Sequence, residues 1–126
     1  MTKICPFCHI TPGDIVSENA LVLMIEDRFP VSPGHTLIIP RRHVETYFDA
    51  DSEEKAALWA MVETARDRLD SLHAPAGYNI GINVGETAGQ TIMHLHIHVI
   101  PRYPGDMADP RGGVRHVIPD KGKYQP

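Results

Sequence analysis

Three histidines alternate with aliphatic residues near the end of the chain, where the sequence from position 94 reads His-Leu-His-Ile-His-Val-Ile-Pro. Side chains of a β-strand point alternately to its two faces, so the pattern predicts a strand with His94, His96 and His98 on one face and their aliphatic neighbours in a core. Such crowding of imidazoles indicates a site for metal, phosphate or proton transfer, because imidazole changes charge near neutral pH. A solvated strand face that is merely rich in histidine is a poor alternative, since only eight histidines occur in 126 residues.

The chain has the size and composition of one globular domain. Its 126 residues, 42% of them hydrophobic, are enough to bury a single core, and we expect one domain over residues 1–126. No stretch is long enough to span a bilayer and no secretory signal pattern is present, which predicts a cytoplasmic protein with no membrane partner. The formal net charge of -4 gives no broad attraction for polymeric nucleic acid.

Hydrophobic patterning predicts further strands besides the one that carries the histidines. Two short apolar runs, at 20–26 and 35–40, are separated by prolines and a glycine, and residues 78–84 alternate between apolar and polar. The short, turn-rich connection between the first two runs favours antiparallel pairing.

One long helix is also expected. Asp51 with Glu54 three residues later resembles a capping box, and the helix that it opens runs to about Leu72 with one apolar stripe. Residues 102–126, rich in Pro, Gly, Asp and Arg, predict an irregular C-terminal tail. These elements together predict an α+β fold, in which an antiparallel sheet of about five strands has one long helix packed on one face.

The only two cysteines, Cys5 and Cys8, lie in a Cys-Pro-Phe-Cys segment. In a reducing compartment this spacing favours metal ligands or a redox pair over a structural disulfide. A thioredoxin-like pair lacks its βαβ context here, and a pair of unliganded thiols is the third possibility. The residues by themselves leave these alternatives open.

Three segments of the chain resemble those of a known family. The segment Gly-Gln-Thr-Ile-Met-His-Leu-His-Ile-His-Val-Ile-Pro-Arg at 89–102 closely resembles the signature of the histidine triad (HIT) superfamily of nucleotide hydrolases and transferases. The segment 33–43 is similar to a second block of that family, and the opening Cys-Pro-Phe-Cys resembles the start of its bacterial, zinc-bearing members. The resemblance implies a HIT-like fold and an enzyme of the diadenosine polyphosphate hydrolase or adenosine phosphoramidase type.

The resemblance further implies covalent catalysis at the α-phosphate of a nucleotide. His96 would attack the phosphorus and form a nucleotidyl-histidine intermediate that releases AMP, a role that suits imidazole because it is nucleophilic when neutral and leaves more easily than an alkoxide. His98 and His35 would donate to phosphate oxygens, while Gln90 and Thr91 would reach the bridging oxygen and the leaving group. The uridylyltransferase branch of the family has Gln at the third triad position, so His98 favours hydrolysis over transfer between sugars.

Binding residues follow from the same resemblance. A structural zinc is expected on Cys5, Cys8, His43 and His94, because two thiolates and two imidazoles make a closed tetrahedral set. Asp27 falls where family members hold the ribose, and a carboxylate suits two vicinal hydroxyl donors. The other expected nucleotide contacts are Phe7, Ile15 and Ile25 around a purine, with Asn83, Gln90 and His98 near the phosphates.

Two other functions compete with this prediction. In the first alternative, His94, His96 and His98 together bind a catalytic metal, as three imidazoles do in some zinc hydrolases. On one straight strand, however, the first and third side chains stand about 13 Å apart, which is too far for both to bind one ion. A non-catalytic module that binds or senses nucleotides is the second alternative. Family members are usually homodimers, so we expect a homodimer whose partner is a small-molecule adenosine phosphate, while the physiological leaving group stays undetermined.

Overall fold

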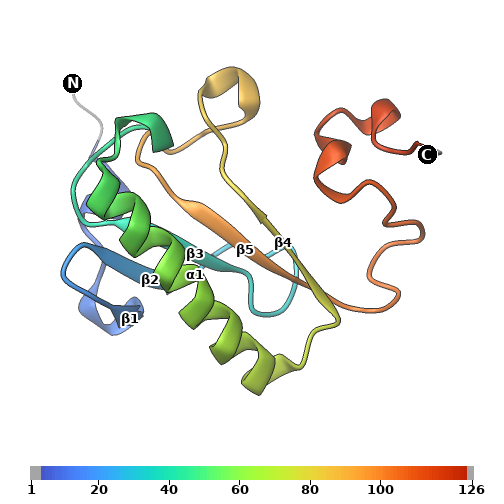
Figure 1. Cartoon of the computed structure of the whole chain (residues 1–126), viewed down its shortest axis with the longest axis horizontal. Coiled ribbons are helices and arrows are strands. Elements are labelled where there is room, and N and C mark those ends of the chain that lie inside the picture. The colour runs from blue at the N-terminus through green and yellow to red at the C-terminus, as the bar shows by residue number, and fades with distance from the viewer. Residues whose placement is uncertain (1–3, 125–126) are drawn as a thin grey trace.

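A computed structural model describes residues 4–124 and contains one sheet of five antiparallel strands, in the order β1-β2-β3-β5-β4, with a single long helix across one face (Figure 1). The α+β architecture predicted from the sequence is therefore confirmed. The first three residues of the expected domain and the last two of the expected tail lie outside the described residues. The strands are β1 Ile15–Glu18, β2 Val22–Glu26, β3 Thr36–Pro40, β4 Gly77–Gly81 and β5 Ile97–Arg102.

Helix α1, Ser52–His73, begins where the capping box predicts. The side chain of Asp51 accepts a hydrogen bond from the Glu54 N–H at 2.8 Å, and the Glu54 side chain accepts one from the Asp51 N–H at 3.0 Å. The two bonds satisfy backbone donors that the start of a helix leaves free. The helix ends at Ala74, whose left-handed backbone with φ 46° turns the chain toward β4.

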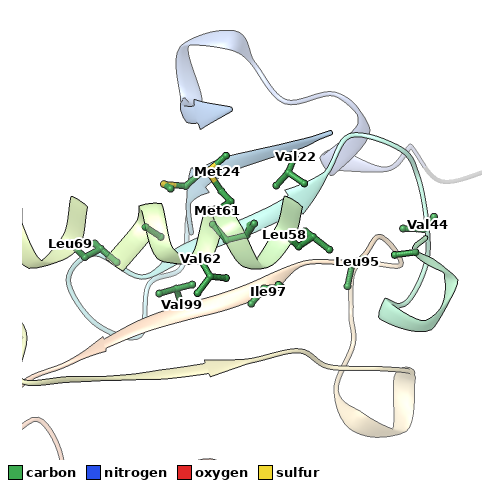
Figure 2. Close-up of a cluster of buried hydrophobic side chains, with 13 residues drawn as sticks. Val22, Met24, Val44, Leu58, Met61, Val62, Leu69, Leu95, Ile97 and Val99 are labelled. Atoms are coloured by element: carbon green, nitrogen blue, oxygen red, sulfur yellow. The ribbon is translucent and has the colours of Figure 1, made fainter. Parts of the chain in front are cut away.

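The main hydrophobic core lies between α1 and the sheet (Figure 2). In β5 the side chains of Ile97 and Val99 point toward the helix and are fully buried. Burial of an aliphatic side chain of this size stabilises the fold by about 1.5 to 3 kcal/mol. The buried members of this core are Val22, Met24, Ile38, Val44, Ala50, Leu58, Met61, Val62, Ala65, Leu69, Leu95, Ile97 and Val99.

The opposite face of the sheet carries a second, smaller apolar cluster. Leu23 of β2 with Leu37 and Ile39 of β3 form its buried part. Half-buried side chains from β1, β2 and the N-terminal segment pack against it: Phe7, Ile10, Ile15 and Ile25. Leu37 pairs directly with His98 of β5, so this cluster and the histidines share the face that α1 leaves free.

The histidine segment differs from its prediction at one end. β5 begins at Ile97, so His94, Leu95 and His96 precede the regular strand. The Leu95 N–H donates to the Val44 carbonyl at 2.8 Å, outside the β3 ladder, and the bend here lets the His94 side chain leave the line of the other two histidines. The prediction that all three histidines share one straight strand face is wrong for this reason, although burial alternates regularly along β5 itself.

Two other strand predictions need correction. The strand expected over 78–84 runs over Gly77–Gly81, because the chain then leaves the sheet for the loop that leads to β5. β1, Ile15–Glu18, was not predicted from the sequence, since it is short and its pairing with β2 has a register shift between Ile15 and Ser17.

The segment after β5 forms a separate layer beside the β4 edge of the sheet (Figure 1). Arg102, expected as the first tail residue, is the last residue of β5. The described residues after β5 contain two short 3-10 helices, Gly113–Val117 and Pro119–Lys121. Within residues 4–124 no helix is both long and apolar enough to cross a membrane.

Candidate active site and metal site

Four sulfur and nitrogen atoms converge where the N-terminal segment meets the approach to β5. The Cys5 Sγ lies 3.3 Å from the His94 Nδ1, and the Cys8 Sγ lies 3.2 Å from the His43 Nδ1. All four ligand atoms lie within 4.8 Å of one another. The structure therefore brings together all four residues that the sequence assigned to a metal.

The hydrogen bonding of His94 fixes which of its nitrogens is free. The Nε2 atom of this fully buried ring lies 2.8 Å from the Pro40 carbonyl oxygen, so Nε2 carries the proton and donates it. The Nδ1 atom then presents a lone pair to both cysteines and, at 3.2 Å, to the His43 Nδ1. A carbonyl that orients the second nitrogen in this way is typical of a metal-binding histidine.

The spacing of these atoms fits a tetrahedral zinc. Zinc bonds of about 2.3 Å to sulfur and 2.0 to 2.1 Å to nitrogen place sulfur and nitrogen about 3.5 Å apart, and two nitrogens about 3.3 Å apart. The observed contacts in the cluster range from 3.2 to 3.5 Å. The protein would fill all four positions around such an ion, which leaves none for a reacting water.

A second group joins the loop before β3 to β5. The Nδ1 of buried His35 accepts from the Val31 N–H at 3.2 Å, so its proton resides on Nε2. That Nε2 donates to the His98 Nδ1 at 2.9 Å and lies 3.4 Å from an Asp27 carboxylate oxygen. Because the His98 Nδ1 accepts this hydrogen bond, the His98 proton resides on Nε2, where it is available to a ligand.

Both of these histidines are held neutral. Burial, together with neighbouring His96 and His35, lowers the pKa of His98 to about 4. Burial also lowers the pKa of His35, although the Asp27 carboxylate opposes that shift. The pair therefore donates hydrogen bonds at neutral pH without adding positive charge to the site.

The ring of His96 is oriented by its own backbone. Its Nδ1 lies 2.8 Å from the His94 carbonyl oxygen and donates to it, so the lone pair is on Nε2. Within residues 4–124 the structure gives this Nε2 no hydrogen-bond partner. The ring stands edge-on to Phe7, with centroids 5.1 Å apart, and 5.0 Å from the ring of His98. His96 is thus held with a lone pair on Nε2, beside the N–H that His98 presents to the cleft.

A cleft of about 1000 Å³ opens over these rings. Phe7 and Ile25 form part of its apolar wall, while Asp27 faces it with its side chain 16% exposed. The Cys/His cluster, which consists of Cys5, Cys8, His43 and His94, contributes no residue to the lining of the cleft, so the two sites are separate. The sequence-predicted residues that line the cleft are Phe7, Ile25, Asp27, His35, Asn83, Thr91, His96 and His98.

The structure places two predicted residues outside the cleft. The amide of Gln90 is buried and fully engaged, because it donates to the carbonyls of Glu45 and Ile92 and accepts from the Gly85 N–H at 2.9 Å. It closes a loop and has no donor left for a leaving group. Ile15 packs in the apolar cluster beneath the cleft, and the cleft wall at β1 is formed by Val16 instead.

Other residues of the cleft are not predicted from the sequence. Val31 sets the tautomer of His35 through its backbone N–H, and no side-chain pattern encodes such a contact. Arg28 and His9 also line the cleft. The position of Arg28 directly after Asp27 is the one signal that could have pointed to it.

The geometry also bears on the alternative of a catalytic metal held by the triad. The Nδ1 of His94 faces Cys5 and Cys8, and its Nε2 is bonded to Pro40, so this ring has no nitrogen for an ion shared with His96 and His98. The close approach of Asp27, His35 and His98 is accounted for by the hydrogen bonds already described. The three-histidine metal site is therefore wrong for this chain.

The chain is similar in sequence to known proteins. "Protein hit" of Bacillus subtilis is 41% identical over 104 residues, which span 79% of this chain and 71% of that protein. "AP-4-A phosphorylase" of Mycobacterium tuberculosis is 36% identical over 95 residues, 75% of this chain but only 49% of that longer protein.

A solved structure agrees in fold. The crystal structure of a zinc-bound histidine triad family protein from Mycobacterium smegmatis superposes with a TM-score of 0.74 at 37% identity, covering 83% of this chain and 79% of the other. The family model described as HIT domain matches residues 10–105, which include His35, His96 and His98 of the cleft and two of the four residues of the Cys/His cluster. The chain therefore belongs to the HIT domain family.

Proposed function

We propose that this protein is a nucleotide hydrolase that cleaves adenosine dinucleotide polyphosphates or adenosine 5′-phosphoramidates at the α-phosphate and releases AMP. The observation that carries the proposal is the state of His96: its Nδ1 is tied to the His94 carbonyl at 2.8 Å, and its Nε2 is free in the cleft. A binding site alone would gain nothing from an oriented nucleophile.

The reaction runs in two displacements at phosphorus. The lone pair of His96 Nε2 attacks the α-phosphorus, the bond to the leaving-group oxygen or nitrogen breaks, and an N–P bond links AMP to the ring. Water then attacks the same phosphorus, the N–P electrons return to Nε2, and AMP departs with the oxygen of water. His98 supplies a preorganised N–H donor to the non-bridging oxygens, on which negative charge is concentrated. His35, expected to donate to the phosphate as well, has its one ring N–H engaged by His98 and instead fixes the tautomer of that ring.

Other cleft residues position the nucleotide. Asp27, which lines the cleft, accepts from the ribose hydroxyls, and Phe7 and Ile25 contact the purine. Asn83 and Thr91 line the cleft and bind the phosphates or the leaving group. Gln90 takes no part in this proposal, because its amide is committed to the loop.

The Cys5, Cys8, His43 and His94 cluster binds a structural zinc in this account. When bound, the ion ties the N-terminal segment to the approach of β5 and so fixes the backbone carbonyl of His94. That carbonyl in turn orients His96. The metal thus supports the nucleophile from outside the cleft and takes no part in the chemistry.

A homodimer is part of the same proposal. The edge strand β4 and the outer face of α1 carry exposed apolar side chains, among them Ile80, Trp59 and Leu72. Sedimentation or light scattering at micromolar concentration should give twice the chain mass. A monomer mass would contradict this part of the proposal and leave the chemistry untouched.

AMP release tests the activity directly. Purified protein and a His96→Asn variant are incubated with adenosine 5′-phosphoramidate and with diadenosine polyphosphates, in the presence and absence of inorganic phosphate. AMP formed by the parent and lost in the variant supports hydrolysis, whereas ADP formed only with phosphate would show phosphorolysis instead. Tight nucleotide binding with no product from any substrate would make the chain a non-catalytic binding module.

A further inference from the structure

A second cavity, of about 290 Å³, lies on the same sheet face as the catalytic cleft. Side chains two residues apart in a strand share a face, so His98, Ile100 and Arg102 of β5 all point away from α1. His98 lines the cleft, and Ile100 and Arg102 line the second cavity. Hereafter this second cavity is called the recess.

The recess is contiguous with the cleft. Val31 lines both cavities and so lies at the boundary between them. Ile100 lies about 6.6 Å and Arg102 about 13 Å beyond His98 along the strand. A leaving group attached to a phosphate that is bound at His96 and His98 can therefore extend past Val31 into the recess.

The recess has polar lining residues, and the charge of Arg102 is compensated by that of Asp106. The Arg102 guanidinium donates to both Asp106 carboxylate oxygens at 2.8 Å and to the Asn79 side-chain oxygen at 2.6 Å, so its charge and three of its donors are already engaged. Ile100 and Met107 add apolar surface. Such a site has no free cation for a phosphate, and it suits an uncharged flat or apolar group flanked by a few polar atoms.

The tail supplies part of the lining of the recess. Met107, Pro110, Gly113 and His116 all belong to the segment after β5 and line the recess. The His116 Nε2 lies 2.7 Å from the Arg111 carbonyl oxygen, a bond that folds this part of the tail on itself. The walls thus come from β4, β5, the loop before β3 and the tail.

We infer that the recess is a specificity subsite, which binds the distal, uncharged part of the leaving group, such as the second nucleoside of a dinucleoside polyphosphate. The inference rests on the proposed function, because it assigns the side of the cleft from which the leaving group departs. A substrate whose leaving group is ammonia cannot reach the recess. The subsite therefore favours substrates with large leaving groups over adenosine 5′-phosphoramidate.

The test fills the recess from the tail. Met107→Trp adds bulk to its lining, and Val117→Trp adds the same bulk at an exposed tail position that lines neither cavity. For Met107→Trp, the ratio of kcat/KM for diadenosine triphosphate to kcat/KM for the phosphoramidate should fall at least tenfold. Val117→Trp should leave the ratio within twofold of the parent. Equal ratios in parent and Met107→Trp would overturn the subsite while leaving the hydrolase intact.

A binding measurement separates this inference from the chemistry. Calorimetry on His96→Asn compares diadenosine triphosphate with AMP, so no turnover is needed. The dinucleotide should bind at least tenfold more tightly than AMP, and adding Met107→Trp should remove that advantage. Equal affinity of the two ligands for His96→Asn would overturn the subsite. If the parent hydrolyses neither substrate but His96→Asn still shows the affinity difference, the proposed activity is overturned and the subsite is not.

Discussion

His94 and His96 are the same residue type two positions apart, yet the structure gives them opposite tasks. The buried His94 ring donates from Nε2 to the Pro40 carbonyl and turns Nδ1 toward two cysteines, whereas His96 donates from Nδ1 to the His94 carbonyl and keeps Nε2 free in the cleft. In each ring, the backbone carbonyl that accepts from one nitrogen leaves the lone pair on the other nitrogen. The comparison teaches that backbone acceptors, and not the histidine pattern itself, divide the segment into a metal ligand and a nucleophile.

Removing the nucleophile should have the largest effect. His96→Asn keeps a donor for the His94 carbonyl but removes the nitrogen lone pair, so AMP release should fall at least about 1000-fold. The melting temperature and the zinc content should match those of the parent. Activity within tenfold of the parent would show that His96 is not the attacking group.

Loss of the metal should act on stability first. Chelation of zinc, or His43→Ala, should lower the melting temperature by about 10 °C or more, since a closed site contributes its binding energy to folding. Activity per folded molecule, measured well below the transition, should fall far less than in His96→Asn. Purified protein that contains no zinc would contradict the structural assignment, and restoration of the melting temperature by added zinc is the control.

The loop held by Gln90 should give the next largest effect. Gln90→Ala leaves two carbonyls and one N–H without their partners in a buried position, which should lower the free energy of unfolding by about 2 to 3 kcal/mol. Denaturant unfolding measures this loss. If Gln90→Ala keeps full stability but loses activity selectively toward one leaving group, Gln90 acts in catalysis and the structural role is wrong.

The neutral state of His98 predicts a pH effect on stability. Its pKa is lowered to about 4, while an unfolded histidine titrates at about 6.5, so the unfolded chain binds the proton first as pH falls. Stability should therefore decline between about pH 6.5 and pH 4, by about 2 kcal/mol once solvent access to the ring is allowed for. His98→Gln should reduce this slope, and an unchanged slope would contradict the assigned neutral tautomer.

The ribose contact should give the smallest of these changes. Asp27→Asn preserves an oxygen for the Phe29 N–H but removes the carboxylate charge, so KM for adenosine substrates should rise about tenfold while kcat changes less than threefold. Steady-state kinetics with 2′,3′-dideoxy substrates provide the control, because these lack the hydroxyl donors and should not distinguish the variant from the parent.

Local sequence signals predicted much of the molecule. The capping box at Asp51 and Glu54 encodes the start of α1 through two short-range bonds, and strand periodicity encodes the face of His98. The grouping of the four metal ligands followed from a family resemblance. The register shift in β1 and the bend before β5 depend on contacts between distant segments, such as Leu95 with Val44, which no local pattern contains.

Side-chain direction was the hardest property to predict in the site. Gln90 directly precedes Thr91, yet its amide turns to the Glu45 carbonyl, a partner 45 positions away. The tautomer of His35 depends on the backbone of Val31 in the same way. The recess beyond His98 is lined in part by tail residues whose irregular composition gives no periodic signal.

The most direct test of the division between the two histidines is mass spectrometry of protein quenched in acid-free denaturant during turnover of an adenosine 5′-phosphoramidate or diadenosine substrate. We expect one adenylyl group on the peptide of residues 94–102, located on His96, with zinc still bound in the undenatured sample. An adduct on His94 or His98, or turnover with no adduct at any time point, would contradict it.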